Sequence, residues 1–176
     1  MAGTLTVQNI EGPSSGANAN KVIIPGHVVQ FVSADNHTKS VITTNQGSGF
    51  TDIAGTVTIT PTNTSSKIYV RIVFPGGNVT AGLGIDFRIL RDSTVLKHFT
   101  NISHRASDDG NAGAGNISTH VIEYIDSPSS TSSHTYKWQV ALRTNNSGTF
   151  TINDDSGGTS GASVGGTVVT AMEIAQ

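Results

Sequence analysis

The sequence contains no cysteine, which excludes disulfide bridges and cysteine-ligated metal sites. It is also poor in charge, because Asp, Glu, Lys and Arg together make up only 12% of the chain and leave a net charge of −2. The ten Lys and Arg residues are scattered singly rather than clustered, which argues against a nucleic-acid-binding surface. No apolar run approaches the length that spans a bilayer, so membrane insertion is not expected.

The usual sequence motifs of metal sites and catalytic sites are missing as well. None of the six histidines stands two or four residues from another, so the common two-histidine metal spacings do not occur. No Gly-x-Ser-x-Gly elbow joins a strand to a helix, and nothing points to the paired carboxylates of a glycosidase. The sequence therefore predicts no catalytic residues, no metal, no cofactor and no enzymatic activity.

Two features leave alternatives open. The acidic pairs Asp108–Asp109 and Asp154–Asp155 could supply oxygen ligands to Ca²⁺, but both stand in Gly-rich loops, where aspartates also build tight turns. Turn formation is the preferred interpretation. Trp138 could stack on a sugar if it were exposed, but its neighbours on the same strand face are apolar, which favours a position in the core or in a subunit interface.

What the chain does contain is abundant Ser, Thr and Asn, with 20 Gly among 176 residues. Disordered chains are usually highly charged, whereas this one is not. Uncharged, hydroxyl-rich chains that fold are typically β-sandwiches or barrels with many turns. The length suffices for one domain with a core of its own.

From residue 27 onward the apolar residues alternate with polar ones. In the segment 67–74, Ile68, Val70, Ile72 and Phe74 fall on one face, and this period of two predicts a half-buried strand. No stretch shows a helical period. The sequence thus predicts an all-β fold, an antiparallel two-sheet β-sandwich with a jelly roll as the preferred arrangement. Further strands are predicted at 28–33, 39–44, 55–60, 85–89, 93–99, 118–125, 136–142, 148–153 and 166–174.

Residues 1–26 form a Gly-, Ser- and Asn-rich lead, so we divide the chain into an N-terminal anchoring arm (1–26) and a β-sandwich domain (27–176). The arm has neither a basic n-region nor an apolar h-region, and no Sec signal peptide is predicted. Leu5, Val7 and Ile10 are apolar at near-alternating positions, which suits the addition of a strand to an exposed sheet edge. We expect the arm to dock on a neighbouring subunit or partner; packing on its own domain is the alternative.

Five blocks of sequence carry a resemblance to a known family. They are GTLTVQNI (3–10), GTVTITPTNTSSKIYV (55–70), FRILRDSTVL (87–96), DSPSSTSSHTY (126–136) and the closing MEIAQ (172–176). These blocks resemble virion structural proteins of marine and cyanobacterial tailed phages. The resemblance implies a trimeric, C1q/TNF-like jelly-roll head on the particle surface, in a tail fibre, an attachment subunit or a capsid decoration. It also implies synthesis in the host cytoplasm and location in the virion.

The expected partners follow from composition and from this resemblance. A domain with 6% aromatic residues has a modest core, to which oligomerisation would add burial, so we predict a homotrimer. Tyr69, Val73 and Leu90, at outward strand positions, are candidate trimer-interface residues. Capsid or tail proteins are the expected partners of the arm, and a host surface glycan is a further candidate. The alternative function is a stand-alone carbohydrate-binding β-sandwich module, which an exposed aromatic row on one sheet face would favour.

Overall fold

The computed structural model describes residue 14 and residues 24–78, 84–103, 116–143, 148–154 and 165–176. Within these ranges the chain forms ten strands and no helix. Each predicted strand overlaps one of them, so the all-β prediction is confirmed. The strands are β1 (Val28–Asn36), β2 (Ser40–Ile42), β3 (Thr51–Ile59), β4 (Lys67–Asn78), β5 (Gly84–Arg91), β6 (Thr94–Ser103), β7 (Asn116–Asp126), β8 (His134–Leu142), β9 (Phe150–Ile152) and β10 (Thr167–Ile174).

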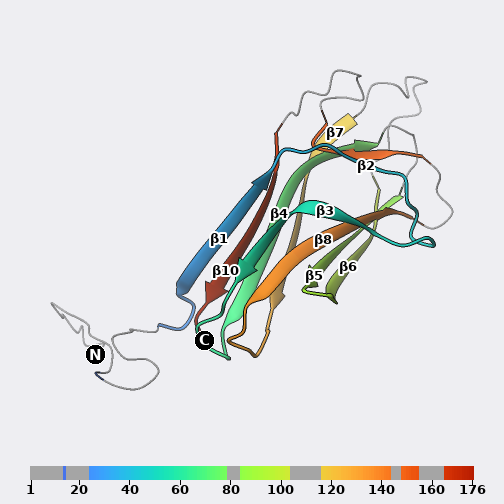
Figure 1. Ribbon diagram of the computed structural model, residues 1–176. Coiled ribbons are helices and arrows are strands. Elements are labelled where there is room, and N and C mark those ends of the chain that lie inside the picture. Colours follow the sequence, from blue (N-terminus) through green and yellow to red (C-terminus); the bar gives the residue numbers. More distant parts are fainter. Residues whose placement is uncertain (1–13, 15–23, 79–83, 104–115, 144–147, 155–164) are drawn as a thin grey trace, which may run out of the picture.

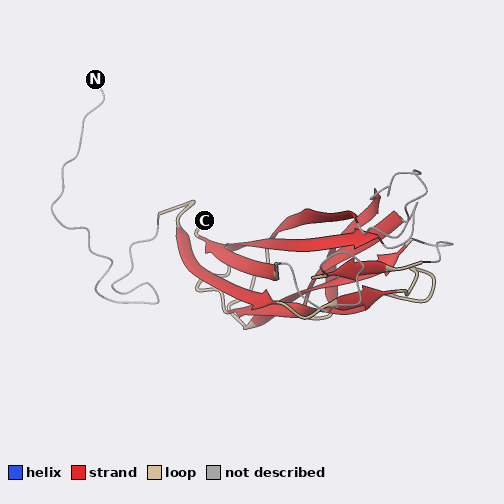
Figure 2. Ribbon diagram, turned by 90° about the horizontal axis from the view of Figure 1, so that it is seen from above, coloured by secondary structure: helices blue, strands red, loops and turns tan. Residues whose placement is uncertain are grey.

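The strands form two antiparallel sheets that lie face to face as two layers (Figures 1 and 2). Sheet A runs β1, β10, β4, β7; toward one end of β4 the short β9 takes the place of β10 and pairs with β2. Sheet B runs β3, β8, β5, β6. The predicted two-sheet antiparallel sandwich is therefore confirmed.

The order of the long strands is that of a jelly roll. Setting aside the short β2 and β9, eight strands remain. In one sheet the first lies beside the eighth, the eighth beside the third and the third beside the sixth. In the other, the second, seventh, fourth and fifth are neighbours. Strands close in sequence thus alternate between the sheets, as the two interlocked Greek keys of a jelly roll require.

The core lies between the two sheets and is built from the inward-facing residues of each strand. Phe74 of sheet A packs on Trp138 of sheet B, with ring centroids 4.6 Å apart, and on Phe87 at 5.1 Å. Trp138 is fully buried, so its predicted place in the core is confirmed and a sugar-stacking role is excluded. The isoleucines and valines of the alternating segments fill the remaining space, as the β-branched side chains of half-buried strands commonly do.

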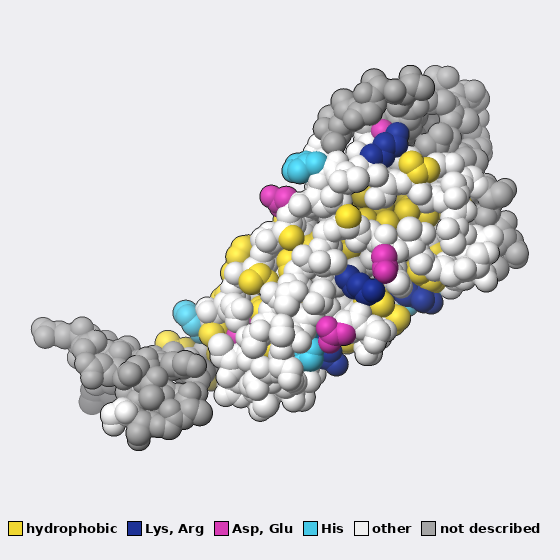
Figure 3. Space-filling model, viewed as in Figure 1, with side chains coloured by type: hydrophobic (Ala, Val, Ile, Leu, Met, Phe, Trp, Pro, Cys, Tyr) yellow, Lys and Arg dark blue, Asp and Glu magenta, His cyan; other side chains and the backbone are white. Residues whose placement is uncertain are grey.

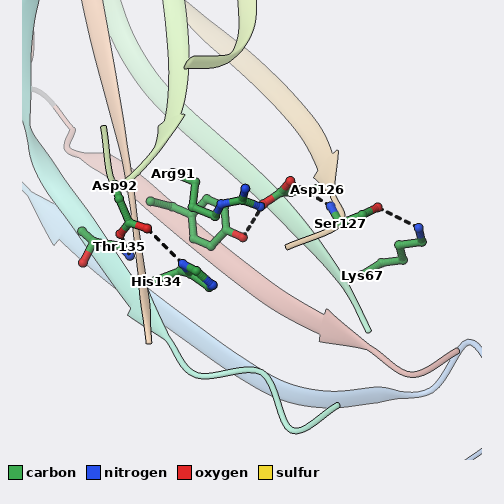
Figure 4. A network of polar contacts seen from close by, with 8 residues as sticks. Lys67, Arg91, Asp92, Asp126, Ser127, His134 and Thr135 are labelled. Atoms are coloured by element: carbon green, nitrogen blue, oxygen red, sulfur yellow. Dashed lines mark hydrogen bonds and ion pairs between the residues drawn. The ribbon is translucent and has the colours of Figure 1, made fainter. Parts of the chain in front are cut away.

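Two buried carboxylates connect separate parts of the fold by hydrogen bonds near one end of the sandwich. Asp126, at the end of β7 in sheet A, accepts hydrogen bonds from Arg91 Nη1 and from the Tyr136 hydroxyl, each at 2.7 Å. Both donors belong to sheet B, so this network joins the layers (Figure 4). Glu173 on β10 accepts bonds from the backbone N–H and the hydroxyl of Thr62, both at 2.7 Å, and so holds the connection between β3 and β4.

The two ends of the sandwich differ in what they carry. The backbone N–H of Gly26 donates to the carbonyl oxygen of Ala175 at 2.8 Å. Residue 24 and residue 176 therefore lie at the same end, which we call the terminal end. The last residues of β4, β6 and β8 and the first residues of β5, β7 and β9 lie at the opposite, distal end (Figure 1).

A candidate subunit interface on the outer face of one sheet

The outer face of sheet A carries apolar side chains that no other described part of the chain covers. We call this surface the apolar face. Its position follows from the alternation within each strand, because every second residue of these strands points inward to the core. Its members are Phe31, Tyr69, Val73, Val121, Ile125, Val168 and Met172.

Strand register gathers four of these residues into one row. Phe31 on β1 pairs with Met172 on β10, Met172 pairs with Tyr69 on β4, and Tyr69 pairs with Ile125 on β7. The row therefore crosses all four long strands of the sheet. Its two ends are the most open, since Phe31 is 60% and Ile125 is 57% exposed. Apolar side chains this exposed and this close together are typical of an interaction surface.

A second row lies four residues further along each strand. It joins Val168 on β10, Val73 on β4 and Val121 on β7, and it begins at Asp35 on β1. Val168 and Val121 are exposed and Val73 is partly so. The apolar face is therefore a broad surface, rather than a single stripe along one strand.

Between the two apolar rows runs a polar one. It consists of Ser33, Thr170, Arg71 and Glu123 on β1, β10, β4 and β7. Arg71 donates through Nε to Glu123 Oε1 at 3.2 Å, and the two side chains are 46% and 48% exposed. An ion pair this open contributes little to the stability of the single chain. It nevertheless places one positive and one negative charge between two apolar rows.

Tyr69 connects the first row to this pair. Partial burial raises the pKa of its hydroxyl, and a hydrogen bond with Glu123 raises it further. The phenol therefore stays protonated and presents a donor beside the carboxylate at neutral pH. The ring adds apolar area to the row while its hydroxyl is satisfied within the face, an arrangement that suits tyrosine to interfaces.

The outer face of sheet B has a different character. One row across it consists of His98, Arg88, Gln139 and Asp52, which are all polar. The guanidinium of Arg88 lies 3.5 Å from the centroid of the Phe50 ring, and Gln139 donates to Asp52 at 2.8 Å. The view in Figure 3 shows few charged groups on a largely uncharged surface, with apolar side chains along the flank formed by β1 and also in the upper part of the body.

The structure brings together some of the residues selected from sequence. Tyr69 and Val73 both lie on the apolar face. Leu90 does not: it lies on sheet B, beside Val95 and Lys137, and is only 4% exposed. The arm residues Leu5, Val7 and Ile10 lie outside the described ranges, and so do the loop aspartates 108, 109 and 155.

Sequence reasoning missed five members of the apolar face. Each stands at an outward position of a strand that the sequence predicted, so the alternation could have marked them individually. What the alternation could not give is the register that aligns segments more than a hundred residues apart. The missed residues are Phe31, Val121, Ile125, Val168 and Met172.

The described residues offer little for catalysis or metal binding. No group of three or more His, Asp or Glu in these ranges is arranged to hold a metal ion. Asp154, one of the candidate Ca²⁺ ligands, is buried, and its Oδ2 forms an ion pair with Lys39 Nζ at 2.8 Å. In the same ranges no helix is long and apolar enough to cross a membrane.

Comparisons with known proteins find similarity at the level of structure alone. No family model and no curated protein matches the sequence. The chain is similar to VP2 in the subviral particle of infectious bursal disease virus, with 12% identity and a TM-score of 0.44 over 84% of this chain and 38% of that one. Dimeric latent PorU from Porphyromonas gingivalis gives 11% identity and a TM-score of 0.45, over 96% of this chain and 14% of PorU. The chain thus spans well under half the length of these proteins.

Proposed function

We propose that this chain is a non-enzymatic structural protein of a tailed-phage virion, in which it forms a homotrimeric tail-fibre, attachment or capsid-decoration subunit on the particle surface. The observation that carries the proposal is the apolar face of sheet A. Exposed apolar side chains that adjoin one another over four strands are best explained by assembly. The sequence resemblance to virion proteins of tailed phages supports the kind of particle.

The energetics favour contact between copies through this face. Phe31, Ile125 and Val121 stand in water in the single chain, and burying each large apolar side chain is worth roughly 1.5–3 kcal/mol. Four members of the face are exposed and three are partly buried, and burying them on every copy opposes the cost of bringing subunits together, which is on the order of 4–15 kcal/mol. In the trimer, each copy would turn its apolar face toward a common axis, and the polar outer face of sheet B would meet the solvent.

The arm supplies the proposed link to the particle. Residue 24, to which the arm connects along the chain, lies at the terminal end and leads into β1, an edge strand of sheet A. The alternating Leu5, Val7 and Ile10 would add a strand to an exposed edge of a capsid or tail protein. Three arms on one trimer would strengthen attachment through multivalency. The distal loops would then face away from the particle, where a host surface glycan is a candidate ligand.

Light scattering on the purified full-length chain tests the assembly. We expect a mass three times the 18.2 kDa of one chain, and we expect Ile125→Asp to reduce it to that of the monomer. Val95→Asp is the matched control, because Val95 is, like Ile125, an exposed β-branched residue of a strand but lies on sheet B. A wild-type mass of one chain at every concentration would reject the trimer.

Localisation tests the biological role separately. Antibodies raised against the full-length chain should label purified phage particles in immunogold electron microscopy, and the position of the gold would distinguish capsid from tail. A protein that is present in infected cells but absent from purified particles would not be a virion component, whatever its oligomeric state.

One observation favours a second candidate, a carbohydrate-binding module. Phe31 and Tyr69 lie in the same row, and aromatic rings aligned on one sheet face can stack on sugars. Met172 separates the two rings in the row, however, and the charged groups beside Tyr69 are paired with each other, since Arg71 donates to Glu123, whereas sugar sites keep polar groups available for the ligand. Affinity electrophoresis in gels containing soluble polysaccharides decides between the two. The module predicts retardation of a monomer, abolished by Phe31→Ala with Tyr69→Ala.

A further inference from the structure

We propose that Arg71 and Glu123 determine how many copies of the chain assemble on the apolar face, and in which orientation, by forming a closed ring of alternating charges between three copies. This inference rests on the proposed trimer and deepens it. The occupant of the face is a second copy of the same chain, and the argument is charge complementarity.

The first step is the position of the pair. Arg71 and Glu123 occupy the central row, with the row of Phe31 and Ile125 on one side and the row of Val168 and Val121 on the other. Any partner that covers both apolar rows must also cover the pair. The charges then lose water, which is costly unless the partner supplies compensating groups.

The second step is the bonding capacity of the pair. Within the described part of the chain, Arg71 donates through Nε to Glu123 Oε1, and Glu123 also accepts a hydrogen bond from the Tyr69 hydroxyl. A carboxylate can accept about four hydrogen bonds and the guanidinium fork has further N–H donors, so the Nη groups and the remaining lone pairs of Glu123 can bond to groups of another molecule. Each copy thus offers both a cationic donor and an anionic acceptor at the same height on the face.

The third step is symmetry. When identical copies surround a three-fold axis, the Arg71 of each copy can face the Glu123 of the next, and every charge then has one partner in its own chain and one across the interface. The result is a ring of six alternating charges. Arrangements that place aliphatic residues over the pair leave both charges desolvated without new partners, so the pair disfavours the wrong register or number of copies. A polar group within an apolar seam specifies oligomer state in coiled coils for the same reason.

Four variants of the full-length chain test the ring, with native mass spectrometry and light scattering as readouts. Arg71→Glu and Glu123→Arg each make all six charges alike, and we expect each to raise the concentration of half-dissociation at least about tenfold. The double variant R71E/E123R keeps the alternation and should restore the wild-type value. The apolar variant R71M/E123L should still associate, but as a mixture of oligomer sizes instead of one.

The control is Lys137→Glu, which reverses a charge of the exposed Lys137–Asp52 pair on sheet B and should leave assembly unchanged. Circular dichroism checks that every variant is folded. The inference is overturned if the single reversals assemble like wild type, if the double reversal fails to restore assembly, or if R71M/E123L gives a single trimer. Each of these three outcomes concerns the variants alone, so a wild type that is measured as a trimer leaves the proposed function standing. A wild type that is monomeric throughout overturns both.

Discussion

Tyr136 on sheet B donates its hydroxyl to Asp126 on sheet A at 2.7 Å, and Arg91 donates to the same carboxylate oxygen from the neighbouring strand. The phenol is fully buried. Burial, together with the hydrogen bond to Asp126, raises the pKa of Tyr136 far above its usual range, so the hydroxyl remains a donor. The contact fastens the two layers at the terminal end, where β5, β7 and β8 come together (Figure 4).

Two variants that remove this contact should lower the free energy of unfolding by different amounts. Tyr136→Phe deletes one hydrogen bond to a charged group and should cost about 1.5–3 kcal/mol. Asp126→Ala leaves the hydroxyl and the guanidinium without their acceptor and should cost about 3–5 kcal/mol. Urea denaturation measures both. Lys67→Ala, which removes an exposed bond to Ser127, should change stability by less than about 0.5 kcal/mol; similar losses in all three variants would contradict the assignment.

Glu173 should make the domain sensitive to acid. Burial raises the pKa of Glu173, but hydrogen bonds from Ser66, Thr62 and Gln30 lower it more, so the net shift is downward from 4.5. The unfolded chain therefore binds this proton more readily than the folded domain does. Ionised Glu173 stabilises the fold above pH 4.5, and this contribution is lost as the pH falls from there through the lower folded-state pKa.

Glu173→Gln tests this dependence in urea denaturation at a series of pH values. The variant should show a shallower loss of stability in acid, because the titrating group is gone. At pH 7 it should be less stable by about 1–3 kcal/mol, since the amide nitrogen cannot accept the bonds of the carboxylate. Asp35→Asn, at an exposed position of β1, should leave the acid slope as it is. An unchanged slope in Glu173→Gln would show that other carboxylates cause the loss.

Gly76 should tolerate no side chain. It stands where β4 exchanges its partner β10 for β9, and a Cβ there would lie 2.7 Å from Cζ of Phe150 and 3.1 Å from the carbonyl oxygen of Thr151. We expect Gly76→Ala to lower the free energy of unfolding by about 1–3 kcal/mol through overpacking. Gly47→Ala is the control, because only the Asn45 side chain lies near, at 3.3 Å. Equal stability of the two variants would contradict this account.

Deleting residues 1–20 should separate folding from attachment. The truncated chain should keep its melting temperature and its oligomeric mass, because the ten strands begin at Val28. It should no longer enter phage particles, which quantitative mass spectrometry of purified virions measures. Replacing Leu5, Val7 and Ile10 by Ser should have the same effect, whereas Thr4→Ser with Thr6→Ser should not. Normal occupancy of the truncated chain would place the anchor elsewhere.

The fold was predictable because its evidence is local. The alternation of Ile68, Val70, Ile72 and Phe74 indicates a strand without reference to any other segment, and ten such segments with no helical period leave few architectures. Tyr69 and Val73 were accessible to the same reasoning, as outward residues of that strand.

The apolar face was not predictable as a unit, because it depends on pairing between distant segments. Nothing near Phe31 indicates that Met172 will lie beside it, since this neighbourhood exists only once β1 and β10 are in register. Leu90 shows the opposite effect. Alternation places it outward, yet it is buried in the single chain, because exposure also depends on the side chains of adjacent strands.

The backbone hydrogen bond between Gly26 and Ala175 determines where a foreign peptide can be attached to this domain for display. Any domain or affinity tag fused after Gln176 would emerge beside the junction between the arm and the domain, close to the segment that we propose as the anchor. Cargo inserted between β4 and β5, or between β6 and β7, would instead leave from the distal end, a full strand length away. Insertion at the distal end is therefore the appropriate choice for presenting a foreign peptide while keeping the terminal end clear.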